Sequence, residues 1–147
     1  MRLFYLQEGK YSVLGEILTK QGEDFVGILE DFKKADAQYI KSITGFTALF
    51  KRFSDKGQGS LPKHLFHKPD ADDDLYQFIK GDLRLICFFN DSGNAVVLSH
   101  YEVKKGDKLP QKALNKARKL RKQYHIDQKA GKIKFFDEKD GKLIPRK

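Results

Sequence analysis

The most informative segment of the chain is Leu83-Arg84-Leu85-Ile86-Cys87-Phe88-Phe89, in which Arg84 is the only charged residue. A short run that is apolar on both faces is typical of a central strand covered on each side by other elements. Residues 75–80 and 95–103 are also rich in aliphatic and aromatic residues, and Asn90–Asn94 has the composition of a hairpin turn. These segments predict three antiparallel strands, with residues 83–89 in the middle.

The residues before this sheet are expected to form one strand and three helices. Leu3–Gln7 has the pattern of a short strand. Apolar residues then recur at helical spacing in three groups: Tyr11, Leu14, Ile17 and Leu18; Phe25, Ile28, Leu29, Phe32, Ala35 and Tyr39; Ile43, Phe46, Leu49, Phe50 and Phe53. Ser42 or Thr44 would cap the third helix. Aromatic stripes of this kind usually belong to a core, and we assign them to the core.

The residues after the sheet predict a basic helix that begins near Pro110, a residue suited to a first helical turn. Its apolar face consists of Ala113, Ala117, Leu120 and Tyr124, with Leu114 beside it. Beyond Asp127 two arrangements stay open. Lys132–Phe136 and Leu143-Ile144 could form a hairpin about a turn at Asp140-Gly141, or this segment could be a loosely attached tail.

Together these patterns predict an α+β fold in which an N-terminal strand and helices pack on a small antiparallel sheet, followed by a basic C-terminal helix. A length of 147 residues favours a single domain over residues 1–147. Within it we expect an extended N-terminal helical region at about 10–56 and a C-terminal hairpin or tail at about 128–147. No parallel crossover unit is expected in the sheet.

The expected location of the protein is the cytoplasm. Cys87 is the only cysteine, so an intramolecular disulfide is impossible and a reducing compartment fits best. The first residues lack the long apolar region of a signal peptide. No stretch approaches the roughly 20 apolar residues of a membrane span, so no membrane contact is expected.

The positive charge of the chain is concentrated in one segment. The net charge is +9, and residues 104–122 contain nine cationic side chains and a single acidic one, which gives this segment +8. The nine are Lys104, Lys105, Lys108, Lys112, Lys116, Arg118, Lys119, Arg121 and Lys122. Such a concentration favours a binding surface for a polyanion. The alternative is a solvated helix face that keeps the protein soluble.

Arg84 lies in a strand that otherwise has the composition of core, so its charge must be paired or must border a groove. One possibility is a structural salt bridge with the acidic cluster Asp70–Asp74. The other is a phosphate ligand, because a guanidinium binds phosphate oxygens bidentately. The sequence alone favours neither.

The strand that ends at His100-Tyr101-Glu102-Val103 runs directly into the basic segment. Cleavage of RNA by its own 2′-hydroxyl needs a base, an acid and cations that stabilise charge on the phosphoryl oxygens. The candidate proton carriers are His100, Tyr101 and Glu102, and the candidate cations are Arg84, Lys104, Lys105 and Lys108. Strand alternation places His100 and Glu102 on one face and Tyr101 on the other. The alternative is that Tyr101 belongs to the core and His100 is an ordinary sheet residue.

Neither a metal nor a cofactor is expected. Counting from Asp70, the twelfth position of an EF-hand loop would be Gly81 instead of the glutamate that binds calcium. His64-x-x-His67 has no further well-spaced zinc ligands. Phosphate-binding glycine loops and nucleophile elbows are absent from the sequence.

The segments quoted above resemble the core of RelE/HigB-like toxins of type II toxin–antitoxin systems, within the RelE/ParE superfamily and its phage-derived HigB-like branch. The resemblance covers about residues 73–124. Its most specific part is Lys104-Lys105 followed by Lys108-Leu109-Pro110, together with the upstream Arg84. It departs from the family on the strand at residues 75–80, where Gln77 and Ile79 stand near the places of two family lysines and only Lys80 supplies a cation.

The resemblance implies a toxin that cleaves mRNA without a metal, often on the ribosome, and that an antitoxin protein inhibits. Arg84 would contact the scissile phosphate, and Lys104, Lys105 and Lys108 would form the basic loop before the last helix. His100 and Tyr101 complete the candidate catalytic set. The candidate RNA-binding residues are Lys80, Lys112, Lys116, Arg118, Lys119, Arg121 and Lys122.

Three functions remain open from the sequence. The first is an endoribonuclease toxin that acts on mRNA, either free or on the ribosome. Its antitoxin is expected to be a helix-turn-helix protein from a neighbouring gene. The second is a non-catalytic RNA- or ribosome-binding protein that uses the same basic surface. The third is a ParE-like gyrase poison on the same fold.

Overall fold

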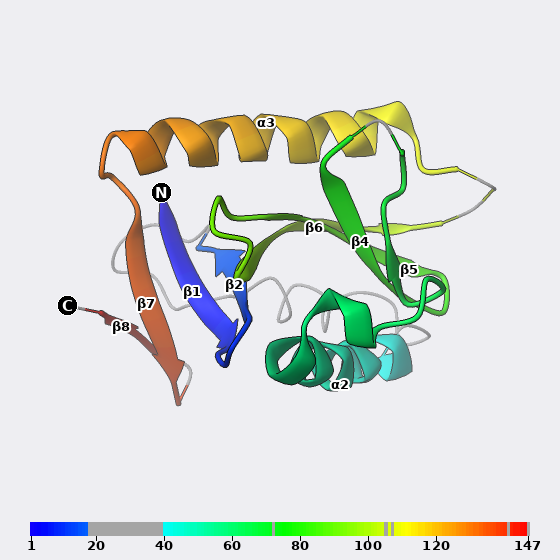
Figure 1. The fold of residues 1–147 in the computed structure, drawn as a ribbon, viewed down its shortest axis with the longest axis horizontal. Helices are drawn as coiled ribbons and strands as arrows, with labels where there is room; N and C mark the ends of the chain where they lie inside the picture. The colour runs from blue at the N-terminus through cyan, green and yellow to red at the C-terminus, as the bar shows by residue number, and fades with distance from the viewer. Residues whose placement is uncertain (18–39, 72, 105, 107, 141, 147) are drawn as a thin grey trace.

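The computed structural model describes residues 1–17, 40–71, 73–104, 106, 108–140 and 142–146. In this part of the chain one mixed sheet is covered by α2 on one face and by α3 on the other (Figure 1). The elements are β1 (Arg2–Gln7), β2 (Ser12–Glu16), α2 (Ile40–Lys56), a 3-10 helix (Gln58–Ser60), β3 (Phe66–His67), β4 (Leu75–Lys80), β5 (Leu83–Phe89), β6 (Ala95–Val103), α3 (Gln111–Lys129), β7 (Lys134–Lys139) and β8 (Lys142–Pro145). The α+β class is therefore confirmed.

The three central strands have the predicted bounds and direction. β4 pairs antiparallel with β5, and β5 pairs antiparallel with β6. The β4–β5 turn contains Gly81 with a φ of 58°, a conformation that glycine adopts at little cost. Opposite Cys87 and Ile86, β6 contains one extra residue, Ser99, which forms a bulge in the ladder. The bulge lies next to His100, which pairs with Ile86. The His100 side chain is therefore on the same face of the sheet as Ile86, the face that α3 covers.

The prediction of a first helix around Tyr11–Leu18 is wrong, because Ser12–Glu16 forms strand β2. Val13 packs in the core on the α2 side, whereas its neighbour Leu14 packs on the α3 side. A central strand buried on both faces has apolar residues without alternation, so Tyr11, Leu14 and Ile17 had helical spacing only by coincidence. The second predicted helix, Phe25–Tyr39, lies outside the described residues.

The sheet is larger than expected and is not purely antiparallel. Its strand order is β3-β4-β5-β6-β2-β1-β7-β8, with eight strands in the described part of the chain. β2 lies parallel to β6, and β1 lies parallel to β7. The prediction of a small antiparallel sheet is therefore wrong. The C-terminal residues form a hairpin, β7–β8, that extends this sheet beside β1.

An aromatic layer fills the space between α2 and the sheet. Four residues of the apolar stripe predicted for this helix are buried: Phe46, Leu49, Phe50 and Phe53, of which Phe46 and Phe53 are fully inaccessible to solvent. Phe78 of β4 lies at the centre of the layer. The centroid of its ring is 4.7 Å from the ring centroid of Phe66, 5.2 Å from that of Phe50 and 5.8 Å from that of Phe53. Because α2 already includes residue 40, positions 42 and 44 lie inside the helix, so the predicted start of this helix is wrong.

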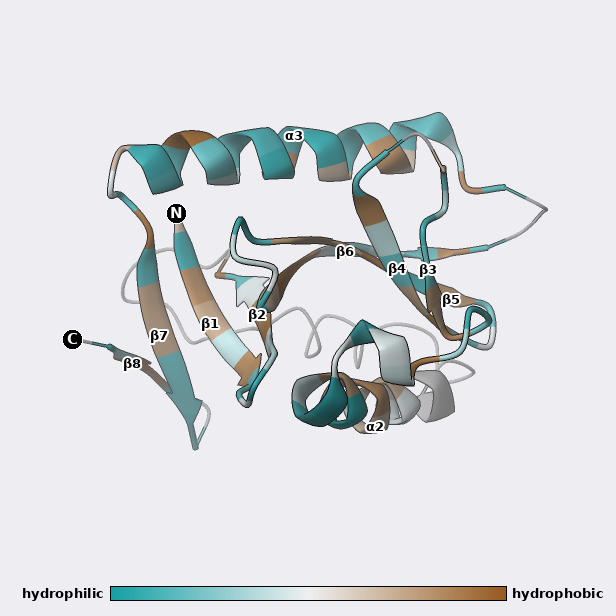
Figure 2. Cartoon of the chain, viewed as in Figure 1, coloured by the Kyte–Doolittle hydropathy of each residue, from teal (hydrophilic) through white to brown (hydrophobic). Residues whose placement is uncertain are grey.

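A second layer joins α3 to the opposite face of the sheet. Ala113, Leu114, Ala117 and Tyr124 are buried against strand residues that include Ile86 and Phe88, and Leu120 is partly buried. Most of the other residues of α3 are hydrophilic, as Figure 2 shows, and Ile126 is an exposed apolar exception. Pro110 is the N-cap of α3, one residue before the predicted position in the first turn. None of the helices in the described residues is both long and apolar enough to cross a membrane.

Candidate nucleic-acid interface

A cleft of about 600 Å³ lies between the end of β6 and the first half of α3. From α3 its lining includes Lys112, Asn115, Lys116 and Lys119, and from β6 it includes Glu102. The lysines are spaced i, i+4 and i+7, so they form one row along the helix. All three are exposed. The row can therefore present ammonium groups to successive phosphates of a bound strand.

His100 lies beside the cleft residue Glu102 and is only 8% exposed. Its Nδ1 is 2.8 Å from Oγ of Ser99, and its Nε2 is 3.3 Å from Oε1 of Glu102. Burial, together with the positive charge of Lys116, lowers the pKa of His100 to about 4. The imidazole is therefore neutral at pH 7, and any proton transfer to it is weakly favoured.

Arg84 belongs to the same end of the sheet, because it pairs directly opposite Glu102 across β5 and β6. Its Nη1 donates to the carbonyl oxygens of Gly81 and Leu83, at 2.7 Å and 3.1 Å. Burial lowers its pKa, and the negative charge of Asp82 partly offsets the effect. Among the described residues no carboxylate lies within ion-pair distance of the guanidinium.

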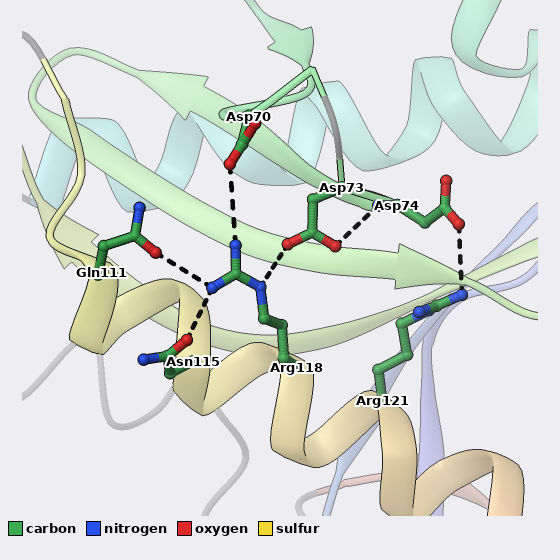
Figure 3. A network of polar contacts seen from close by, with 7 residues as sticks. All are labelled: Asp70, Asp73, Asp74, Gln111, Asn115, Arg118 and Arg121. Atoms are coloured by element: carbon green, nitrogen blue, oxygen red, sulfur yellow. Dashed lines mark hydrogen bonds and ion pairs between the residues drawn. The ribbon is translucent and has the colours of Figure 1, made fainter.

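Arg84 forms no salt bridge with the described residues of the acidic cluster, so this possibility from the sequence is wrong. The cluster precedes Leu75, which pairs with Phe88 at one end of β5, whereas Arg84 pairs with Ile79 near the other end. The carboxylates of Asp70, Asp73 and Asp74 contact α3 instead, as Figure 3 shows. Arg118 Nε donates to Asp73 at 2.5 Å, Arg118 Nη2 lies 3.8 Å from Asp70, and Arg121 Nη2 lies 3.5 Å from Asp74.

Two of the candidate site residues lie on the face of the sheet that carries α2. Tyr101 pairs opposite Leu85 and packs against the core beneath α2. Lys80 lies across α2, since its side chain occupies the space that a Cβ at Gly45 would need. Both are therefore separated by the sheet from the cleft.

The remaining candidates follow β6 or lie farther along α3. The Lys104 amide donates to the carbonyl oxygen of Asp82 at 2.8 Å, which places the exit of β6 beside the β4–β5 turn. Lys108 is exposed just before α3, and Lys122 is exposed beyond the cleft. Lys105 lies outside the described residues. The structure thus places Glu102 in the cleft with Lys112, Lys116 and Lys119. His100 lies next to Glu102, and Arg84 pairs opposite Glu102 in the ladder.

Sequence reasoning missed Asn115 and Ser99, because neither residue type carries a signal of its own. It also missed a second cavity of about 760 Å³ beside β1, β7 and β8. There the Arg146 guanidinium lies 3.7 Å from the centre of the Tyr5 ring and donates to Asp137. No group of three metal-binding side chains converges within the described residues.

A comparison of the sequence with models of protein families assigns the chain to a family. An α+β protein with a cationic cleft at the end of its sheet could serve several functions. Residues 30–122 match the family model described as Phage derived protein Gp49-like (DUF891). The match covers more than half of the chain, and the chain belongs to this family.

The family is associated with toxins of toxin–antitoxin systems, which supports a toxin-type function and an antitoxin partner. The match begins at residue 30, well before the residues 73–124 on which the resemblance rested. It therefore includes all of α2 as well as β3 to β6 and the first part of the basic helix. No curated protein matches the chain.

Proposed function

We propose that the protein is a RelE/HigB-like toxin of a toxin–antitoxin module and that it cleaves mRNA with the RNA 2′-hydroxyl as the nucleophile. The observation that carries this proposal is the cleft, in which Lys112, Lys116 and Lys119 face a strand end that bears His100 and Glu102. Family membership supports the toxin role. Growth inhibition in the cytoplasm, where mRNA is translated, would be the outcome.

The chemistry requires a cation at the reacting phosphate. Arg84 fits this role because its guanidinium has no carboxylate partner among the described residues, although Gly81 and Leu83 hold one end of it. Lys104 and the cleft lysines would stabilise the other phosphoryl oxygens. No step in this scheme uses a metal. Lys105 and Lys108 would add positive charge where the strand enters.

Induced expression in a bacterial host tests the toxin proposal. The wild-type protein should arrest growth, and Arg84→Ala should relieve the arrest while the protein still accumulates to the same level. Lys129→Ala is the matched control, because this lysine lies in the last turn of α3 beyond the cleft. Full toxicity of Arg84→Ala would contradict the assignment of Arg84.

A second candidate is a non-catalytic protein that binds RNA or ribosomes through the same cleft. The observation in its favour is the neutral, buried His100, which is poorly suited to carry protons at pH 7. Mapping of RNA 5′ ends after induction separates the two functions. New 5′-hydroxyl ends in mRNA support cleavage, whereas growth arrest without new ends supports binding alone. Repeating the reaction with purified protein and free RNA tests ribosome dependence.

The antitoxin can be sought in the neighbouring reading frame. We propose a small helix-turn-helix protein as the partner. Its co-expression should restore growth, and its co-purification with the toxin would establish the complex. An unrelated neighbour that fails to restore growth would count against this partner.

A further inference from the structure

Glu102 is the one carboxylate among the described residues that line the cleft, where the helix contributes three lysines. A carboxylate in a phosphate-binding cleft repels the ligand unless it contacts a hydrogen-bond donor of that ligand. The sugar–phosphate backbone of RNA offers such a donor at every nucleotide, the ribose 2′-hydroxyl. DNA has none at that position.

The side chain of Glu102 lies next to a buried imidazole. Its Oε1 lies 3.3 Å from His100 Nε2, and His100 Nδ1 lies 2.8 Å from Ser99 Oγ. At this distance Nε2 makes no hydrogen bond with any described residue and is buried without a partner among them. A neutral imidazole with its hydrogen on Nε2 can accept from the Ser99 hydroxyl, and a small rotation of the Glu102 side chain on ligand binding would let Nε2 donate to the carboxylate. The Glu102 side chain is 34% exposed, so one side of the carboxylate stays open to the cleft.

Arg84 lies directly opposite Glu102 in the β5–β6 ladder, yet the two form no ion pair. The Arg84 guanidinium is turned toward the carbonyl oxygens of Gly81 and Leu83. A phosphate bound near Arg84 and the lysine row would therefore place its neighbouring ribose close to an unneutralised carboxylate.

We propose that Glu102 accepts a hydrogen bond from the ribose 2′-hydroxyl of single-stranded RNA bound in this cleft, and that His100 is the positioning residue for its carboxylate. This inference rests on the RNA binding in the proposed function. It makes Glu102 the residue that distinguishes RNA from DNA.

The same contact lets Glu102 act on the hydroxyl during cleavage. The carboxylate takes the 2′-hydroxyl proton as the 2′-oxygen forms a bond to phosphorus. The bond from phosphorus to the 5′-oxygen breaks, and that oxygen takes a proton from the Lys116 ammonium group. The products are a 2′,3′-cyclic phosphate and a 5′-hydroxyl, and Glu102 and Lys116 return to their initial states by proton exchange with water.

Binding measurements on three short single-stranded oligonucleotides of one mixed sequence test the proposal: RNA, its 2′-fluoro analogue and its 2′-deoxy analogue. Neither analogue can donate from the 2′ position, and the fluoro form retains the sugar geometry of RNA. Fluorescence anisotropy gives the affinities, and a gel of the recovered RNA measures the fraction cleaved, so that only readings taken before appreciable cleavage are compared. Wild type should bind RNA about tenfold more tightly than either analogue.

Two variants separate recognition from proton transfer. Glu102→Ala removes the acceptor, so the preference for RNA should fall to about onefold, and the deoxy strand should bind a few-fold more tightly because the repulsion is gone. Glu102→Gln keeps an acceptor oxygen without the charge. It should retain part of the preference for RNA but lose cleavage. Glu138→Ala on β7, away from the cleft, is the control and should match wild type.

An unchanged preference for RNA in Glu102→Ala would overturn the proposal, as would a preference that changes with base sequence while the sugar has no effect. If wild type binds none of the strands, both this proposal and RNA binding in the proposed function fail. If wild type prefers RNA and the Ala variant does not, but induction produces no new RNA 5′ ends in cells, the recognition of RNA by Glu102 stands and the endoribonuclease activity fails. Equal melting temperatures of the variants would show that the difference is not a folding defect.

Discussion

Arg118 Nε donates to a carboxylate oxygen of Asp73 at 2.5 Å, which ties the middle of α3 to the loop before β4. The same guanidinium also contacts Asn115 and Gln111 on its own helix. Arg121 pairs with Asp74 one turn later. Much of the positive charge on this side of α3 is therefore neutralised within the chain, and the lysines of the cleft are left to face a ligand.

Replacement of Arg118 or Asp73 by alanine should lower the free energy of unfolding by about 1 kcal/mol, because the pair is partly buried and joins two elements. The double variant should lose less than the sum of the single variants, with a coupling energy of about 0.5–1 kcal/mol. Urea unfolding of the four proteins measures the cycle. Fully additive losses would mean that the pair does not stabilise the fold.

Lys116→Ala should weaken RNA binding and reduce the steepness of its salt dependence by about one ion, because this lysine lines the cleft. Arg118→Ala should change the salt dependence much less, since its charge is already paired with Asp73 and Asp70. Affinity measured from low to moderate salt distinguishes the two. Lys129→Ala serves as the control on the same helix, and equal effects of all three variants would indicate a non-specific contribution of helix charge.

His100 should make the protein less stable at mildly acidic pH. Its pKa is about 4 in the folded chain and about 6.5 in the unfolded chain, so the unfolded state binds more protons between these values. The contribution of the neutral imidazole to the free energy of unfolding is fully present above about pH 6.5 and is lost as the pH falls toward 4. The loss between pH 7 and pH 5 should be about 2 kcal/mol.

Chemical denaturation at both pH values measures this effect, with His100→Gln as the comparison. The variant keeps a polar side chain but has no group that titrates in this range. Its unfolding free energy should decline less than that of wild type between pH 7 and pH 5. Parallel declines in the two proteins would show that groups other than His100 dominate the response. Glu16 is not one of them, because burial raises its pKa and its protonation therefore favours the folded state as the pH falls.

Phe78→Ala should be one of the most destabilising single changes in the chain, with a cost of about 3–5 kcal/mol. The ring is fully buried and contacts three other phenylalanines in the layer beneath α2. Phe78→Leu should cost less, because it retains most of the apolar volume. Thermal unfolding followed by circular dichroism compares them. A mild effect of the alanine variant would mean that the aromatic layer closes over the cavity.

Local patterns predicted the centre of the fold well. The bounds of β4, β5 and β6 agree with the sequence prediction because turn residues separate three strongly apolar segments. The apolar face of α3 was also predicted, since Ala113, Ala117 and Tyr124 recur at helical spacing over several turns between charged residues. The five residues of β2 are too few for any period to be distinguished when both faces are buried.

Long-range relationships could not be predicted. The parallel pairs β2–β6 and β1–β7 join distant segments, and composition carries no information on such registers. The partner of the acidic cluster depended on where α3 crosses the sheet, so the sequence did not identify Arg118 as that partner. The cleft itself forms between two elements and appears only when both are placed.

The pairing of β1 with β7 also has a consequence for folding. Arg2 of β1 lies beside Lys134 of β7. Two strands that are more than a hundred residues apart in the sequence must therefore meet before this part of the sheet is complete. The hairpins β4–β5 and β5–β6 close short loops and can form early, whereas the β1–β7 contact carries a large loop-closure entropy. During synthesis on the ribosome, the edge of β1 that faces β7 stays open until β7 has emerged. Until then that edge can pair with another strand, so nascent chains of this protein should be prone to aggregation.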